Sequence, residues 1–277
     1  MSVSSPAPTV RRLRLGFIGW GAIAARVGEL LAARNLPGVE IVAVAVRDPE
    51  VARAGLPVGA RLLHGPEDLA GLDLDLVIEA AGRPAVAIWG EAALRHAGAF
   101  AVSSTSAFCD DALFSQLLAT ARETGGQLIV PPGALGGMDA LAAASALELE
   151  AVTHTITKPP HAWAGTPAEA CFDPKTLSER MVFFSGTARE AANRFPQNAN
   201  VAVISALAGL GLERTRIELV ADPAARLNSH AVKAHGAFGR LDVRLENEPL
   251  PDNPKSSQMT ALSLLRLIEN RTAPLVA

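Results

Sequence analysis

The feature that most constrains this chain is a glycine-rich turn between an apolar run and a helical pattern near the N-terminus. Residues 13–18 form the apolar run, and residues 19–24 read G-x-G-x-x-A. Gly19 permits a tight turn, Gly21 lets the backbone approach a pyrophosphate, and Ala24 allows the helix to pack closely on the strand. Free N–H groups at the start of such a helix attract an anion. The predicted cofactor contacts in this dinucleotide-binding turn are Gly19, Gly21, Ala22 and Ile23.

The sequence after the turn supports this interpretation, although a lone motif of this kind also occurs for steric reasons. An amphipathic helix follows, and a second apolar strand lies at the expected distance. That strand ends at Val46, where an acidic residue would favour NAD, and Arg47 follows with a guanidinium group that suits the 2′-phosphate of NADP. In the alternative interpretation, Arg47 is a solvated loop residue and Asp48 binds the ribose. We therefore expect the cofactor to be NADP or NAD.

The first half of the chain has the pattern of a Rossmann fold, an α/β doubly wound parallel sheet. Short apolar runs alternate with helical patterns from residue 13 to about residue 131, as such a sheet requires. The expected strands are Leu13 to Ile18, Ile41 to Val46, Leu74 to Glu79, Ala99 to Val102 and Gln127 to Val130. Helices are expected to begin near Ala22, Glu67, Pro84 and Asp110.

The pattern changes at Pro131-Pro132-Gly133, and a second, mixed α/β domain is expected to follow. We predict helices over residues 134–147, 188–194 and 200–210, and strands over 151–157, 180–185, 216–221, 230–237 and 240–246. A closing helix, 257–270, is long enough to return to the first domain. A length of 277 residues suits two domains. We predict a dinucleotide-binding domain at 1–132, completed by the helix at 255–277, and a substrate domain at 133–254.

Composition excludes several classes of protein. The net charge of −3 gives no global basic field for nucleic acid, and neither a signal peptide nor a long apolar span is evident, so we expect a cytoplasmic protein without a membrane partner. The absence of tyrosine removes the Tyr-x-x-x-Lys pair of short-chain dehydrogenases, and no motif suggests a metal site. Cys109 and Cys171 are expected to be buried free thiols.

Histidine is the natural acid/base group for a dehydrogenase, because its ordinary pKa lies near neutral pH. Of the six histidines, His64 and His96 lie in surface-like segments. His154 and His161 flank Lys158, which can hold an anionic substrate. His230 stands at the start of a strand, after a polar turn, in the expected substrate domain. From residue type alone, a structural or solvated role for His230 stays open.

Five segments together resemble the L-aspartate dehydrogenase family. They are residues 16–24, 131–137 (PPGALGG), 157–160 (TKPP), 197–202 (QNANVA) and 228–230 (NSH). The resemblance runs from about residue 13 to the closing helix. It implies that His230 is the catalytic acid/base, and that Ala134 and Asn200 contact the cofactor. It also implies oxidation of L-aspartate by NAD or NADP to iminoaspartate, which enters NAD biosynthesis or is hydrolysed to oxaloacetate and ammonia, and a homodimer formed through the second domain.

Several assignments stay open at the level of the sequence. Asn200 can instead cap a helix. A dicarboxylate needs at least two cationic or N–H-rich anchors, for which Lys158, Arg226 and Lys233 are the candidates. The competing functions are an imine or semialdehyde reductase on the same fold, related to homoserine dehydrogenase or dihydrodipicolinate reductase, and a dinucleotide sensor without catalysis.

Overall fold

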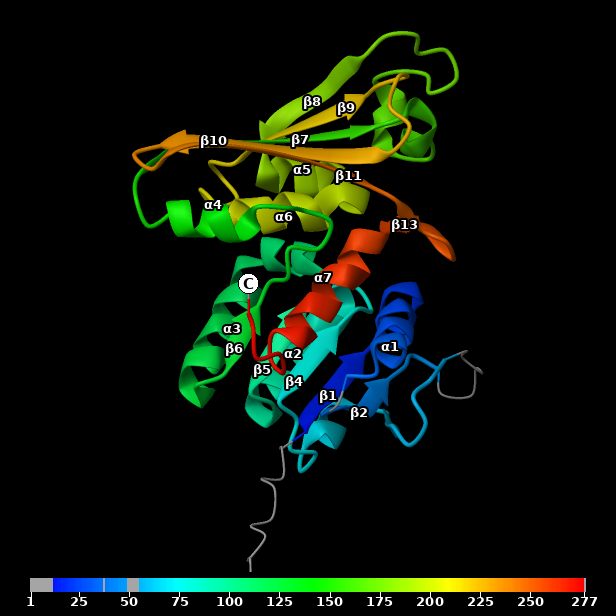
Figure 1. Ribbon diagram of the computed structural model, residues 1–277. Coiled ribbons are helices and arrows are strands. Elements are labelled where there is room, and N and C mark those ends of the chain that lie inside the picture. Colours follow the sequence, from blue (N-terminus) through cyan, green and yellow to red (C-terminus); the bar gives the residue numbers. More distant parts are fainter. Residues whose placement is uncertain (1–11, 37, 49–54, 277) are drawn as a thin grey trace, which may run out of the picture.

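The computed structural model describes residues 12–36, 38–48 and 55–276, and its first half contains a six-stranded parallel sheet (Figure 1). In order across the sheet, the strands are β3 (Arg61–Leu63), β2 (Val39–Ala45), β1 (Leu13–Ile18), β4 (Leu76–Glu79), β5 (Ala99–Val102) and β6 (Gln127–Ile129). Strands β4 and β5 are buried along their whole length, as expected of a parallel sheet covered on both faces. The order reverses between β1 and β4, where the two halves of such a sheet diverge.

Four helices cover the two faces of this sheet. Helix α1 (Ala22–Arg34) and the last helix, α7 (Gln258–Glu269), pack on one face, where Leu264 and Ile268 join a core with Phe17. Arg34 pairs with Glu269 at 3.1 Å between the same two helices. Helices α2 (Arg83–His96) and α3 (Asp111–Thr124) contribute to the core on the other face. The chain therefore returns from its second half to complete the first.

The second half is built on a five-stranded mixed sheet. Its strands, in order, are β11 (Gly239–Asn247), β10 (Asn228–Gly236), β7 (Leu149–Lys158), β9 (Arg216–Ala221) and β8 (Met181–Thr187), of which only β7 and β9 pair in parallel. Helices α4 (Met138–Ala144), α5 (Ala188–Arg194) and α6 (Ala199–Ala208) lie between this sheet and the first half (Figure 1). Along β7, Val152, His154 and Ile156 are buried while their neighbours are less so. A histidine therefore occupies a core position.

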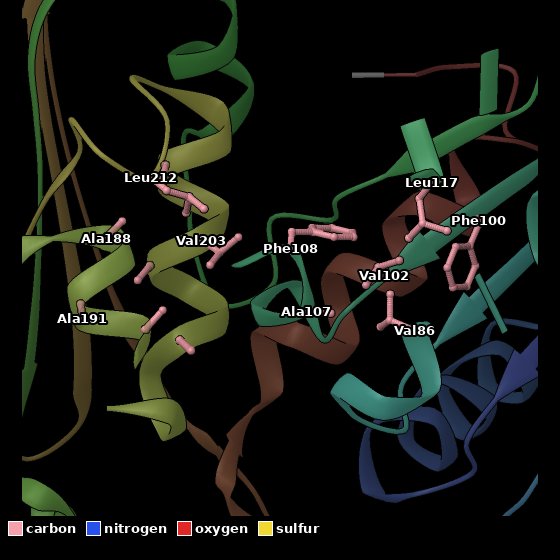
Figure 2. Packing of buried hydrophobic residues seen from close by; sticks show 14 of the residues in the cluster. Val86, Phe100, Val102, Ala107, Phe108, Leu117, Ala188, Ala191, Val203 and Leu212 are labelled. Atoms are coloured by element: carbon pink, nitrogen blue, oxygen red, sulfur yellow. The ribbon is translucent and has the colours of Figure 1, made fainter. Parts of the chain in front are cut away.

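The two halves share one hydrophobic core. A 3₁₀ turn, η2 (Thr105–Cys109), follows β5 and carries Phe108 to the contact. Phe108 packs between Val102 of the first sheet and Val203 of α6 (Figure 2). All three side chains are fully buried. This continuity fixes α6 against the carboxyl edge of the first sheet.

The predicted fold class is confirmed, with a Rossmann sheet and a second mixed α/β sheet, and two of the predicted helices are corrected. The helix expected near Glu67 is only the 3₁₀ turn η1 (Pro66–Leu69), because Ala70 is extended and Gly71 is left-handed. The strand β3 before it was not predicted. The helix expected over 134–147 is limited to α4, because Gly133 and Gly137 have positive φ angles of 59° and 71°.

The polar stretch after residue 246 holds a short antiparallel pair, β12 (Pro249–Leu250) and β13 (Asn253–Ser257). The expectation that both cysteines are buried is corrected. Cys171 is exposed, because it follows the short turn η4 (Pro167–Ala170) outside the sheet, and Cys109 is only partly buried. Both thiols are free. The division into domains at residues 132 and 133 stays a prediction, and residues 1–11, 37, 49–54 and 277 of the predicted ranges lie outside the described residues.

Candidate active site

The glycine-rich turn has the shape of a pyrophosphate cradle. The N–H of Gly19 donates to the carbonyl of Ala45 at 2.8 Å, which holds the turn against β2. Gly19 has a φ of 92°, and a Cβ there would lie 2.7 Å from that of Ala81. At Gly21, by contrast, a Cβ would meet no atom of the described residues within 4 Å, and no side chain in that part of the chain caps helix α1. The first N–H groups of α1 therefore face open space beside the switch point, as a nicotinamide dinucleotide requires.

A buried glutamate organises the loops beside this cradle. Glu79 ends β4 and is fully buried. Its Oε1 accepts from the N–H groups of Ala81 and Gly82, both at 2.7 Å, and from the hydroxyl of Ser104 at 2.8 Å. Its Oε2 accepts from the N–H of Ser104 at 2.9 Å. The carboxylate thereby ties together the loops that follow β4 and β5.

A cavity of about 330 Å³ lies between the two halves of the molecule. The first half contributes Ile23 and the loops after β4 and β5, and the second contributes the ends of β7 and β10 and the start of α6. The residues that line it are Ile23, Ala80, Ala81, Gly82, Ser103, Ser104, Gly133, Ala134, Lys158, Asn198, Asn200, Val201, Ile204, Asn228, His230, Asn247, Ser256, Ser257 and Thr260. A ligand there contacts both the dinucleotide-binding half and the second sheet.

Asn200 joins the two halves at this cavity. Its Oδ1 accepts from the N–H of Ser106 at 3.0 Å, and its carbonyl accepts from the hydroxyl of Thr105 at 2.9 Å. Asn200 is thus not the cap of α6, which is Asn198 without a side-chain hydrogen bond. The carbonyl of Ala134 accepts from the side-chain amide of Asn247 at 3.0 Å.

A second cavity, of about 620 Å³, shares Lys158, Asn198, Asn228 and Asn247 with the first. His161 and Arg226 also line it. The ammonium of Lys158 lies 4.8 Å from the centre of the Trp163 ring, and burial lowers its pKa to about 8. Among the described residues, no carboxylate lines either cavity. The two cavities together therefore suit an anionic ligand.

His230 enters the first cavity from β10 and is paired with a second histidine. Its Nδ1 lies 3.1 Å from Nε2 of His154, whose own Nδ1 lies 2.9 Å from Oγ of Ser205. Burial lowers the pKa of both imidazoles, and the neighbouring His154 and the charge of Lys158 lower that of His230 further. His230 is therefore neutral at neutral pH, so one of its ring nitrogens carries no proton.

The structure brings most of the predicted site residues to these cavities. Ile23, Ala134, Asn200, Lys158 and His230 line the first cavity, and Arg226 lines the second. Gly19, Gly21 and Ala22 form the turn at the start of α1, and Arg47 is exposed just after β2.

Lys233 is not brought to either cavity. It lies three residues from His230 on β10, so it points to the opposite face of the sheet, where it pairs with Asp242 at 3.3 Å. Sequence reasoning missed His154, Ser205, Glu79 and Asn198. The burial of His154 had a sequence signal, since it alternates with apolar residues along its strand, whereas the roles of the other three depend on tertiary packing.

This arrangement defines a class of protein, the nicotinamide-dependent oxidoreductases that join a Rossmann half to a second α/β half. Residues 19–131 match the family model for the NAD-binding domain of homoserine dehydrogenase, and residues 139–271 match the model for the aspartate dehydrogenase C-terminal domain. The chain is 60% identical to L-aspartate dehydrogenase of Brucella anthropi over 94% of its own length and 96% of that protein. The enzyme of the same name from Ruegeria pomeroyi is 42% identical to this chain, over 96% of the chain and 95% of that enzyme. The chain belongs to the L-aspartate dehydrogenase family.

Solved structures agree on the fold. Aspartate dehydrogenase from Thermotoga maritima superposes with a TM-score of 0.75 at 25% identity, covering 96% of this chain and all of that one. Dihydrodipicolinate reductase from Paenisporosarcina superposes with a TM-score of 0.54 at 14% identity, covering 94% and 95%, and shares the fold alone. In the part of the chain that the structure describes, no helix has the length and apolar character needed to cross a bilayer.

We expect alanine substitutions at the two glycines of the cradle to differ in their effect on thermal stability. Gly21→Ala should leave the melting temperature of the cofactor-free protein unchanged, because its backbone is extended and the space is open. The added methyl group should weaken NADH and NADPH binding by about tenfold or more, since it occupies the space that a pyrophosphate approaches. Fluorescence titration and thermal unfolding measure the two effects.

Gly19→Ala is the matched control. Its positive φ and the contact with Ala81 should lower the melting temperature as well as cofactor binding. Unchanged cofactor affinity in Gly21→Ala would show that this turn does not hold the pyrophosphate.

Proposed function

We propose that this protein oxidises L-aspartate to iminoaspartate, with His230 as the general base, and that it runs the reverse reductive amination at the same site. The observation that carries this proposal is the shared cavity, which joins the dinucleotide-binding half to a neutral histidine and a partly buried lysine. A bound nicotinamide supplies hydride acceptance and donation. The remaining steps fall to the side chains of this chain.

The first step for the chain is to remove a proton from the substrate. The amine of aspartate is protonated at neutral pH, and hydride leaves the Cα only when that amine is neutral. His230 lines the cavity as a neutral imidazole and accepts this proton. A carboxylate paired with Lys158 would offset the charge that helps to lower the pKa of His230. Substrate binding thereby makes His230 a stronger base.

The cations of the two cavities select a dicarboxylate. Lys158 stands where the cavities meet, and Arg226 lines the outer one, so we propose that they bind the substrate carboxylates. The buried side-chain nitrogen of Asn198 has no hydrogen-bond partner among the described residues and lies beside them. L-Alanine should be a poor substrate, because it would leave one cation unpaired in a partly dry site.

The cofactor contacts complete the proposal. The amide nitrogen of Asn200 remains as a donor for the nicotinamide carboxamide or ribose, since its oxygen already accepts from Ser106. Ala134 contributes through its backbone, which Asn247 holds in place. As finer expectations from the family resemblance, we propose a cytoplasmic homodimer formed through the second half that supplies NAD biosynthesis.

Replacing His230 tests the catalytic assignment. His230→Ala should lower kcat for L-aspartate by about 100-fold or more, because the base is lost, while NADPH affinity stays near the wild-type value. His235→Ala is the control, since His235 lies on the same strand but is exposed. A His230→Ala enzyme with nearly normal kcat would remove His230 from the mechanism.

The pKa of Lys158 predicts how inhibition by a dicarboxylate depends on pH. Succinate lacks the amine, so its binding reports the anchors without the titration of the substrate nitrogen. Lys158 is charged below its pKa of about 8 and neutral above it. The Ki of succinate should therefore be flat from about pH 7 to pH 8, where both of its carboxylates are charged, and rise by about tenfold per pH unit above pH 8.

Two variants test whether Lys158 causes this rise. Lys158→Arg should remove the rise, because a guanidinium keeps its charge, whereas Lys233→Met on the opposite face should not change it. An alkaline rise that persists in Lys158→Arg would assign the effect to another group.

Because Arg47 lies just after β2, we expect its replacement to change the preference between NADP and NAD. Arg47→Ala should raise KM for NADP by about tenfold, through loss of a charge-assisted hydrogen bond to the 2′-phosphate, and leave KM for NAD within about twofold. Asp48→Asn tests the alternative, in which the carboxylate binds the ribose and KM for NAD rises instead. Equal effects of Arg47→Ala on both cofactors would contradict 2′-phosphate recognition.

A further inference from the structure

His230 is hydrogen-bonded to a second buried histidine, His154, which a general base alone does not require. His154 and His230 come from neighbouring antiparallel strands and lie on the face of the sheet that α6 covers. Their ring centres are 5.3 Å apart. Both rings are buried, at 0% and 7% exposure. Water therefore cannot satisfy the nitrogens between them, and the hydrogen bonds of the protein decide where each proton lies.

Ser205 of α6 fixes which group donates and which accepts in the hydrogen bonds that link Ser205, His154 and His230. The hydroxyl of Ser205 lies 3.1 Å from the carbonyl of Ala202, one turn earlier in α6, and can donate to it. A hydroxyl has one hydrogen, so Oγ then accepts from Nδ1–H of His154 at 2.9 Å. A neutral His154 with its proton on Nδ1 has a bare Nε2, which accepts from Nδ1–H of His230 at 3.1 Å.

If every donor and acceptor in this network exchanged roles, fewer hydrogen bonds would form. If Ser205 donated to Nδ1 of His154, then Nε2–H of His154 would donate to Nδ1 of His230. That arrangement makes two hydrogen bonds, whereas the first makes three by also including the carbonyl of Ala202. In a buried network the arrangement with more hydrogen bonds is favoured.

On the basis of this geometry, we propose that Ser205 and His154 are positioning residues that fix the tautomer of His230, with its proton on Nδ1 and the bare Nε2 presented to the cavity. This inference rests on the proposed role of His230 as a base, since only a bare nitrogen can take the substrate proton. When His230 accepts that proton, Nδ1–H still donates to His154, which stabilises the charged ring.

His154 acts here as a fixed acceptor rather than as a proton relay. Burial keeps its pKa far below the usual value for histidine, so it does not itself take up the proton. Its other nitrogen leads only to Ser205 and then to a backbone carbonyl, which cannot pass a proton on. The proton therefore stays on the cavity side of His230.

Nitrogen NMR of the protein labelled with ¹⁵N-histidine reads the tautomer directly, without any activity measurement. In the cofactor-free wild type, the signals that disappear in His230→Asn should be those of an imidazole protonated on Nδ1 and bare on Nε2. A His230 ring protonated on Nε2 would overturn the inference, whatever the activity of the enzyme.

Variants of the two positioning residues link the tautomer to turnover. His154→Phe keeps a ring but removes the acceptor, so the His230 signals should change toward the Nε2–H form and kcat should fall by about tenfold to 100-fold. His154→Gln offers a side-chain oxygen near the same place and should recover most of kcat. Ser205→Ala gives a second variant, which removes the acceptor for His154 and should yield mixed tautomers even if the phenylalanine variant fails to fold.

The outcomes separate this inference from the proposed function. If His230→Ala is inactive but Ser205→Ala and His154→Phe leave both the tautomer and kcat unchanged, the base assignment stands and the positioning role fails. If His230→Ala remains active while the NMR spectra show the Nδ1–H form, the tautomer assignment stands and the catalytic role fails. NADPH affinity should be unchanged in all of these variants.

Discussion

The packing of α6 against the turn after β5 is the contact on which the rest of the site depends. Each half of the molecule supplies only part of the cavity wall, so the distance between cofactor and base is set by how the halves meet. Phe108 and Val203 supply the apolar part of that contact, and Asn200 supplies the polar part through Thr105 and Ser106. Apolar burial supplies most of the free energy that holds the two halves together, while the directed hydrogen bonds fix the position of α6 along the turn after β5. Small shifts of α6 would therefore move Ser205, and through it both histidines.

Glu79 has the corresponding role on the side of the first sheet. A fully buried carboxylate is costly unless it is hydrogen-bonded, and this one receives four hydrogen bonds from two loops. These loops line the cavity opposite the second sheet. The site thus has two walls, and Glu79 holds the loops of one of them from outside the reacting atoms. Such outer partners limit the freedom of the groups that contact ligand.

The features that were predictable from the sequence are those encoded within short segments. The turn at Gly19 and Gly21 and the buried strands of the first sheet follow from local spacing and continuous apolar runs. Strand β3 did not, because three residues carry too little pattern. The pairing of His154 with His230 depends on the register of strands 76 residues apart, which no local pattern contains. The position of Lys233 was readable, since an offset of three along a strand places it opposite His230.

The return of α7 to the first sheet has a consequence for how the protein folds during its synthesis. Leu15, Phe17, Leu76 and Ile78 belong to strands near the start of the chain, and they share a core with Leu264 and Ile268 near its end. A growing polypeptide leaves the ribosome with its N-terminus first, so this face of the first sheet lacks the cover of α7 until that helix has been synthesised. Products that end before α7 would expose an apolar surface of the kind that quality-control proteases and chaperones recognise.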